Sequence, residues 1–427
     1  MIGDLGLLTR EGMEYYYPIF KDMENWRTPR YKDPFPELPF PNKPRGENAE
    51  EGYRQKLLDK KYTRVYQAGG DLIRVKAVAV WDTVGSLGIP KADWLARLGV
   101  ANSTREFNFY DTALSDRIEH AFHALALDET RPPFSPTIWE RRPENRDTDL
   151  RQVWFPGNHG NVGGGWPDQG IANLSLACTF LSSPLASSPS PLLTIPRTGM
   201  MDQLASVGVD FDDQTIARIH AQSTDYYLAQ AAAAAAAPPP SRLAAALRSI
   251  FAAPRMPWAA EHIYTANTPV RPWALGALRK AGSFFYRLAG RCARRPGLYH
   301  RIDPHTGAAT PQFLEDTGER VHASVRARLA AAGLGLDDAG PWANPALARW
   351  RLRRADDDGR RDSGVLAAFD APAPPAPRWV WVYDGPAADA PPVRVLPEDE
   401  LGVYERRLLG LSGGKPNVLS YAEQKEW

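Results

Sequence analysis

The chain has 427 residues, of which 43% are hydrophobic and 10% aromatic, and its formal net charge is +1. This length and composition allow a sizeable core, in one large domain with an accessory region or in two domains. The near-zero charge argues against a nucleic-acid-binding protein. No apolar run approaches the ~20 residues that span a bilayer, and the first residues lack the features of a signal peptide. We therefore expect a cytoplasmic protein.

The N-terminal residues are predicted to lie outside the core of the fold. Residues 11–46 are rich in aromatic residues and proline. Because proline fixes φ and lacks an N–H donor, this segment is expected to be an extended connection that joins no sheet. Residues 47–66 are charged and are predicted to be helical.

Two apolar strands are predicted, with one helix between them. Residues 73–81 are apolar on both faces, which is typical of a strand covered by helices on each side. Residues 115–127 carry apolar residues at helical spacing and predict an amphipathic helix: Ile118, Ala121, Phe122 and Leu125. Residues 150–155 predict the next strand. Strand, helix and strand together indicate a βαβ unit in a parallel sheet.

Each predicted strand is followed by one polar residue that could carry chemistry. Asp82 ends the first strand, and His159 stands in a loop with glycines at 157, 160, 163, 164 and 165. In open α/β sheets, ligands bind at the carboxyl ends of the strands, so both residues point to one site. A simple turn or cap for Asp82 and a structural role for His159 remain the alternatives.

Other kinds of site are disfavoured. The glycine spacing fits no dinucleotide-binding or phosphate-binding loop. No H-E-x-x-H pattern is present, and the two cysteines, Cys178 and Cys292, have no metal-ligand spacing, so no metal site is expected. His120 and His123, three residues apart on the predicted helix, are interpreted as packing or surface residues.

The second half of the chain predicts mostly helices. Helical patterns cover residues 173–181, 273–295 and 318–332, and residues 379–383 read as a late strand. Alanine-proline stretches at 231–240 and 371–377 are low in complexity and suggest boundaries. We therefore expect one partial domain at 1–228, a linker at 229–241 and an accessory region at 242–427. The basic helix expected at 273–295 could contact a membrane peripherally, although a helix packed on the domain with solvated arginines is favoured.

An acid followed by a histidine, each after a strand, is how an α/β-hydrolase supplies two members of its catalytic triad. The third member, a serine on a G-x-S-x-G elbow, should precede the acid, and we expect the chain to hold no such pattern. Ser86 lies between glycines, but the spacing and the chain order are wrong. We therefore expect the chain to contain no nucleophile elbow and to begin after it.

Three ordered blocks carry a family resemblance: residues 80–88, residues 123–129 and residues 154–165. They resemble an uncharacterised α/β-hydrolase family abundant in filamentous fungi, whose bacterial relatives include type VI secretion phospholipase effectors. Residues 318–326 and 396–402 resemble later blocks of the fungal branch. The family carries a G-F-S-R-G-A elbow followed closely by a segment similar to residues 2–8. By resemblance, Asp82 matches the triad acid and His159 the triad base.

The sequence thus predicts an α/β fold: an incomplete, mainly parallel α/β-hydrolase-like sheet flanked by helices, with a mostly helical C-terminal region. The resemblance implies a serine-dependent ester hydrolase that acts on a lipid or another ester and needs no cofactor. This chain is expected to be inactive for want of the serine. The alternative is a non-catalytic remnant or binding module on the same scaffold.

Overall fold

The computed structural model describes residues 2–28, 30–46, 48–66, 72–84, 112–176, 200–236, 271–280, 290–303, 308–355, 378–411 and 418–425. The chain divides into two compact units. The first comprises Met1–Val78, Ala113–Ala121 and Arg141–Leu150. The second comprises Ala79–Thr112, Phe122–Glu140 and Arg151–Trp427.

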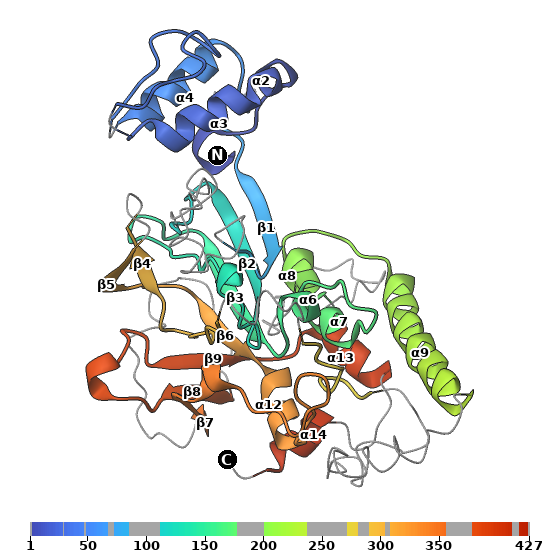
Figure 1. Ribbon diagram of the computed structural model, residues 1–427. Coiled ribbons are helices and arrows are strands. Elements are labelled where there is room, and N and C mark those ends of the chain that lie inside the picture. Colours follow the sequence, from blue (N-terminus) through green and yellow to red (C-terminus); the bar gives the residue numbers. More distant parts are fainter. Residues whose placement is uncertain are drawn as a thin grey trace, which may run out of the picture. The chain divides into compact units, whose positions relative to one another are not determined.

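The first unit has a helical core of its own. Its helices are α1 (Ile2–Leu5), α2 (Arg10–Glu14), α3 (Tyr16–Asn25) and α4 (Ala49–Asp59), drawn in blue in Figure 1. They bury a hydrophobic cluster of Leu5, Ile19, Trp26, Phe40, Ala49, Tyr53 and Leu57. The helix predicted within 47–66 is confirmed as α4.

The expected extended connection at 11–46 is wrong for its first half, where α2 and α3 form. Thr9 caps α2 by accepting the Gly12 N–H, and Pro18 lies in the first turn of α3, where its missing N–H costs nothing. The described residues after Trp26, up to the start of α4, contain no regular helix or strand, as predicted.

The main sheet has seven strands and combines parallel and antiparallel pairs (Figure 1). In spatial order they are β1 (Val75–Trp81), β2 (Ile118–Ala126), β3 (Asp149–Phe155), β6 (Glu319–His322), β9 (Val395–Asp399), β8 (Trp379–Tyr383) and β7 (Trp350–Arg354). β6 runs parallel to β3 and to β9, whereas β8 is antiparallel to β9 and β7. β4 (His300–Ile302) and β5 (Ala309–Phe313) form a separate antiparallel pair. The predicted α/β fold with a mainly parallel sheet is confirmed, as are the strands β1, β3 and β8.

The predicted helix at 115–127 is wrong, because these residues form strand β2. From Phe122 to Ala126 every residue is buried, so the strand has two covered faces and no alternation of polar and apolar residues. Apolar residues on both faces also satisfy helical spacing, and periodicity alone cannot separate the two. The connection from β2 to β3, which the structure describes throughout, holds the 3₁₀ turn η2 (Pro132–Phe134) and no α-helix.

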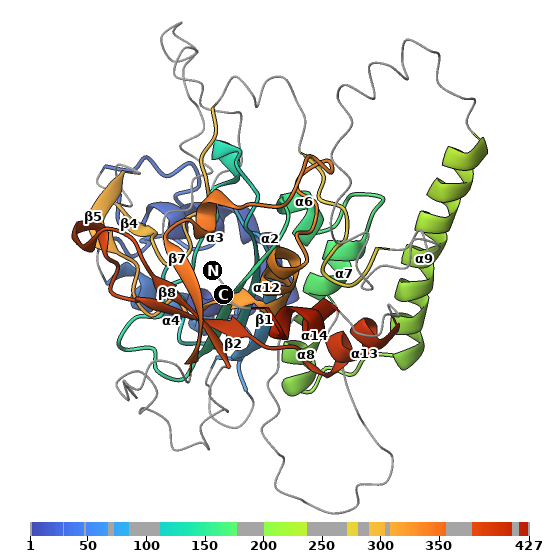
Figure 2. The ribbon, with the colours of Figure 1, turned by 90° about the horizontal axis from the view of Figure 1, so that it is seen from below.

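Helices follow the parallel strands of the second unit. α6 (His159–Val162) and α7 (Gly170–Leu176) come after β3, α12 (Ala323–Ala330) after β6, and α13 (Val403–Leu411) after β9. The remaining ones are α8 (Met200–Ser206), α9 (Asp213–Ala236) and α14 (Val418–Glu423), with the 3₁₀ turns η4 (Pro345–Leu347) and η6 (Ala387–Asp389). α13 packs against α8 and α9, and α12 against α14, as the view in Figure 2 also shows.

Several expectations for the second half need correction. The described residues after 242 contribute six strands in addition to α12–α14, so the described part of this region is less helical than predicted. The helix predicted at 318–332 begins only at α12, because its first residues pair in the sheet as β6. α9 runs through Ala236, into the stretch where a linker was expected, and alanine is the strongest helix former. Strands from before and after residues 229–241 share one sheet. The division into a domain, a linker and an accessory region stays a prediction.

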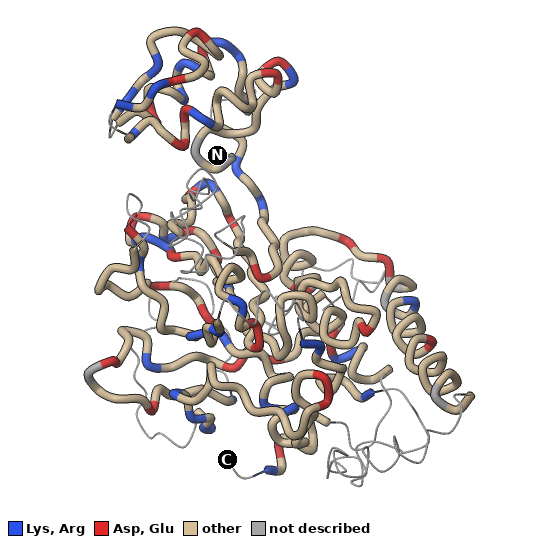
Figure 3. The backbone as a smooth tube through the Cα atoms, viewed as in Figure 1, with Lys and Arg blue, Asp and Glu red and all other residues tan. Residues whose placement is uncertain are grey.

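Basic and acidic residues are interspersed along the described chain and are not segregated in one segment (Figure 3). This agrees with the formal net charge of +1. Among the described residues, no helix has the length and apolar character that crossing a membrane requires.

Candidate active site

Asp82 stands at the carboxyl end of β1 and is completely buried. Its N–H still belongs to the sheet, donating to Ala124 O over 2.7 Å. Its φ of +40° then turns the chain out of the sheet, a conformation that aspartate tolerates better than most residues. The carboxylate Oδ1 accepts the Ala126 N–H at 3.0 Å, which fixes one oxygen and leaves Oδ2 for other donors.

His159 is held by the glycine loop after β3. Asn158 caps the short helix α6 through a capping box with Asn161, so His159 is its first residue. Gly157 makes the turn with φ +104°, and a Cβ there would lie 2.6 Å from the Asn161 Cβ. Glycine at 157 is therefore required for the cap that presents His159.

The two predicted site residues meet. His159 Nδ1 lies 2.8 Å from Asp82 Oδ2, although 77 positions separate them in sequence. Because an ionised carboxylate only accepts, Nδ1 carries a ring proton, and in the neutral imidazole Nε2 is then the nitrogen with the lone pair. The imidazole is 33% exposed and Asp82 is not exposed at all, so the acid orients a ring whose other nitrogen is open. Within the described residues no hydrogen bond reaches Nε2.

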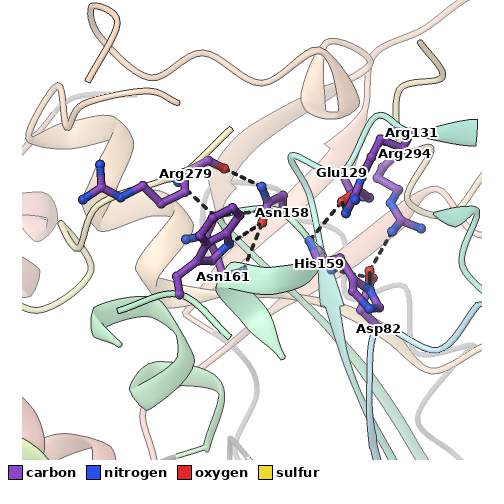
Figure 4. A network of polar contacts seen from close by, with 10 residues as sticks. Asp82, Glu129, Arg131, Asn158, His159, Asn161, Arg279 and Arg294 are labelled. Carbon is purple, nitrogen blue, oxygen red and sulfur yellow. Dashed lines mark hydrogen bonds and ion pairs between the residues drawn. The ribbon is translucent and has the colours of Figure 1, made fainter. Parts of the chain in front are cut away.

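Arg294 is a third member of this cluster. Its Nη2 lies 2.8 Å from Asp82 Oδ2, and both side chains are almost fully buried. Figure 4 shows Arg294 and His159 reaching the same carboxylate. The basic helix expected at 273–295, with solvated arginines, is therefore wrong for the described part. Residues 271–280 and 290–295 contain no helix, and Arg294 is 3% exposed.

A second ion pair supports His159 from the loop after β2. Glu129 Oε2 accepts the His159 N–H at 3.3 Å, and Arg131 binds both Glu129 oxygens at 2.9 and 2.7 Å. Burial alone would raise the pKa of Glu129, but the hydrogen bonds from Arg131 lower it. Arg131 also lies on the Phe134 ring, 3.6 Å from its centroid, and Phe134 meets the His159 ring edge-on at 5.0 Å. His159 is thus held at its backbone N–H by Glu129, and its imidazole ring is held by contact with the Phe134 ring.

The loop is anchored to the segment 277–279. Asn161 Nδ2 donates to Ala277 O at 3.1 Å, and Asn161 Oδ1 accepts the Arg279 N–H at 3.2 Å. Asn158 Nδ2 donates to Arg279 O, and its Oδ1 accepts from Trp166 Nε1 at 3.3 Å (Figure 4). These bonds join the cap of α6 to residues more than a hundred positions away.

The histidines predicted as packing or surface residues lie on a strand, not a helix. His123 is buried on β2, where Nε2 accepts the Thr83 N–H at 3.1 Å and Nδ1 lies 3.1 Å from Gln152 Oε1. Burial lowers the pKa of His123 to about 4, so the ring is neutral near pH 7. His120 lies 3.5 Å from Asp149. Among the described residues no cluster of histidine, cysteine, aspartate and glutamate could hold a metal ion; Cys178 lies outside them, and Cys292 is free and exposed.

A G-x-S-x-G pattern does occur once, at residues 410–414, so the expectation that the chain holds none was wrong. The pattern begins inside α13, which ends at Leu411, whereas an elbow requires a strand that turns into a helix. Its Ser412 also follows both the acid and the histidine in the chain. Ser412, like Ser86, lies outside the described residues.

A second serine, histidine and carboxylate come together deeper in the unit. His322 Nδ1 lies 2.7 Å from Ser324 Oγ, and its Nε2 lies 3.1 Å from Glu405 Oε2. All three side chains are fully buried, and His322 caps α12 by accepting the Ser324 N–H. No substrate can reach this set, so its role is structural.

Sequence reasoning missed Arg294, Glu129 and Arg131. Glu129 ends one of the blocks that carry the family resemblance, which was the available signal. Arg294 had none, because nothing in a run of basic residues marks the one that is buried.

A mostly parallel α/β sheet with an acid and a histidine at the carboxyl ends of two strands is consistent with an α/β-hydrolase-like domain. Residues 1–181 match the model of a family described as "T6SS, Phospholipase effector Tle1-like, catalytic domain". The match covers less than half of the 427 residues and includes both Asp82 and His159. The resemblance to phospholipase effectors is thus confirmed for this stretch, and the blocks at 318–326 and 396–402 lie outside it. Neither a curated protein nor a solved structure matches the chain.

Proposed function

We propose that Asp82 and His159 are the acid and base of a serine-dependent ester hydrolase site that acts on phospholipid esters. The observation that carries this proposal is the 2.8 Å contact between Asp82 Oδ2 and His159 Nδ1, which leaves Nε2 as the nitrogen that can accept a proton. The lipid ester as substrate class is supported by the family matched by residues 1–181.

The mechanism uses side chains alone. A serine hydroxyl attacks the ester carbonyl while His159 Nε2 takes its proton, and the same nitrogen then gives that proton to the departing alcohol. Water, activated by His159, attacks the acyl-enzyme and releases the fatty acid and the free serine. Asp82 keeps the proton on Nδ1 and stabilises the imidazolium that forms in both steps.

For this chain we propose that the site is inactive, because no elbow precedes Asp82 and the one G-x-S-x-G pattern begins inside the helix α13. An inactive chain of this kind acts as a binding module on a hydrolase scaffold. The open Nε2, without a hydroxyl partner in the part of the chain that the structure describes, favours this second candidate.

Two experiments separate these possibilities. The purified chain is expected to show no labelling by a fluorophosphonate probe, which reacts with activated serines. Stoichiometric labelling would contradict inactivity, and S86A and S412A variants would then identify the serine.

A graft tests the acid and base directly. A family segment carrying the G-F-S-R-G-A elbow, fused ahead of Ile2, should restore labelling and fatty-acid release from phospholipid vesicles. Asp82→Asn in the graft should lower the rate about 10⁴-fold by favouring the wrong tautomer, and His159→Gln should abolish it. His220→Gln, far from these residues in the sequence and half-buried on α9, is the control. A folded, labelled graft that keeps its rate in H159Q would refute the assignment.

A further inference from the structure

Arg294 lies on a segment tied to the loop after β2, which contacts His159 through Glu129. The Cys292 N–H donates to Thr130 O at 2.9 Å, and Thr130 stands between Glu129 and Arg131. From this anchor the Arg294 side chain extends to Asp82, 212 positions earlier in the chain. The arginine is therefore built into the site and is not a surface residue that happens to touch it.

The ion pair balances the charge of the buried acid. Asp82 is negative, Arg294 is positive and both are buried, so the cluster is neutral when the His159 ring is neutral. Among the described residues, the charged or titratable groups near it include the paired Glu129 and Arg131, the neutral His123 and the phenol of Tyr299. None of these compensates the Asp82 charge.

Arg294 has no competing anion among the described residues. Its Nη1 is buried without a hydrogen-bond partner, and Asp82 is the carboxylate that pairs with it. Tyr299 lies nearby, but burial raises the pKa of its phenol to about 12, so it stays neutral. The guanidinium charge is therefore directed at one carboxylate oxygen, the one that also accepts from His159 Nδ1.

Removing the guanidinium would leave a buried carboxylate without a counterion, which is strongly unfavourable. Among the described residues, the His159 ring is bonded to this carboxylate and can supply a positive charge by binding a second proton on Nε2. A protonated Nε2 cannot act as a base. With Arg294 in place, a second positive charge beside the guanidinium is opposed.

We propose that Arg294 is a positioning residue of the candidate site, which neutralises and orients the Asp82 carboxylate and thereby keeps His159 neutral with a bare Nε2. This proposal rests on the proposed function for its significance, because a bare Nε2 is what a general base requires. It differs from the hydrolase assignment because it concerns the protonation state of the His159 ring and not the turnover of a substrate.

The test is the protonation state of the His159 ring at pH 7, read from ¹⁵N shifts of the full-length chain labelled at histidine. The His159 signal is assigned with H159Q. Wild type is expected to show one protonated nitrogen and one bare nitrogen. R294M should show both nitrogens protonated, whereas R294K, which keeps the charge, should resemble wild type. R279M is the matched control, because Arg279 is a nearby arginine whose backbone N–H bonds to Asn161 in the loop after β3.

A bare Nε2 in folded R294M would overturn the proposal, and so would an R294K signal like that expected for R294M. If R294M does not fold, R294Q replaces it, since glutamine keeps a donor without the charge. If neither folds, the melting temperatures of D82N and D82N/R294M decide. D82N/R294M should be at least as stable as D82N, because the double variant lacks the buried guanidinium that D82N leaves unpaired. A clearly lower melting temperature of D82N/R294M would refute the pairing of Arg294 with Asp82. The ¹⁵N measurement needs no turnover. It can therefore support the role of Arg294 in an inactive protein and contradict that role in an active one.

Discussion

The buried lysine of the first unit offers a sharp test of how its helices are held together. Lys43 Nζ lies 2.8 Å from Asp22 and 2.9 Å from Asp33, and it also donates to Phe35 O at 2.7 Å. The side chains of Lys43 and Asp22 are 3% and 2% exposed. Lys43→Met keeps the bulk of the stem but leaves Asp22 buried without its main counterion.

The expected cost follows from this geometry. Removing one partner of a buried ion pair costs about 3–5 kcal/mol, because the other charge stays buried. Two features of the site place the expected loss at the low end, about 3 kcal/mol at pH 7. The Tyr53 hydroxyl still donates to Asp22 at 2.6 Å, and burial already raises the pKa of Asp22 in the folded chain.

The raised pKa of Asp22 also makes the loss of stability in K43M depend on pH. A carboxyl with a higher pKa in the folded state stabilises that state when protonated, so its contribution is present below the ordinary value of 3.8 and is lost as pH rises through the folded pKa. Without Lys43 this pKa rises further. The K43M variant should therefore be least destabilised at acid pH and most destabilised at neutral pH.

Urea denaturation and hydrogen exchange of peptides from α3 and from residues 30–46 measure the effect in the intact chain. Lys76→Met is the control, because Lys76 and its partner Glu119 are 62% and 32% exposed and such pairs contribute about 0–1 kcal/mol. A K43M protein within about 0.5 kcal/mol of wild type at pH 7 would refute the reasoning, since that value lies well below the range for a buried pair.

Two further predictions concern the candidate site. In Gly160→Ala the new Cβ would lie 2.5 Å from Trp166 Nε1, so we expect a loss of about 1–3 kcal/mol and faster hydrogen exchange over 157–166. Gly410→Ala, in open space on α13, should not be destabilised, and equal effects would contradict the steric argument. Because burial lowers the pKa of His123 to about 4, wild type should lose stability as pH falls from 6.5 toward that value. His123→Gln should flatten this acid limb in urea midpoints, and an unchanged slope would count against it.

The parts of the fold that sequence could predict are those with an unambiguous local pattern. β1, β3 and β8 are short apolar runs bounded by polar or glycine residues, and α4 is a charged amphipathic segment. β2 was misread, because a strand buried on both faces loses the alternation that identifies strands. β6 was missed because only four residues pair, two of them Glu319 and Arg320, directly before a helix.

The site divides in the same way. Asp82 and His159 were predictable because loops after parallel strands converge at one edge of a sheet, so that chain order and strand ends suffice. Arg294 depends on a pairing between residues 212 positions apart, which no periodicity encodes. Its burial, not its type, distinguishes it from Arg291 and Arg295, and burial is a property of the folded chain.

The family match and the structural unit that holds the site differ in extent. The match ends at residue 181, yet β3 pairs with β6, and the Trp154 indole donates to Glu319 at 2.9 Å. Asp82 in turn depends on Arg294 for its counterion. Residues beyond the match therefore cover the strand that leads to His159 and neutralise the acid that orients it. A fragment ending at residue 181 would retain both candidate residues but would leave the β3 edge unpaired and the Asp82 charge uncompensated.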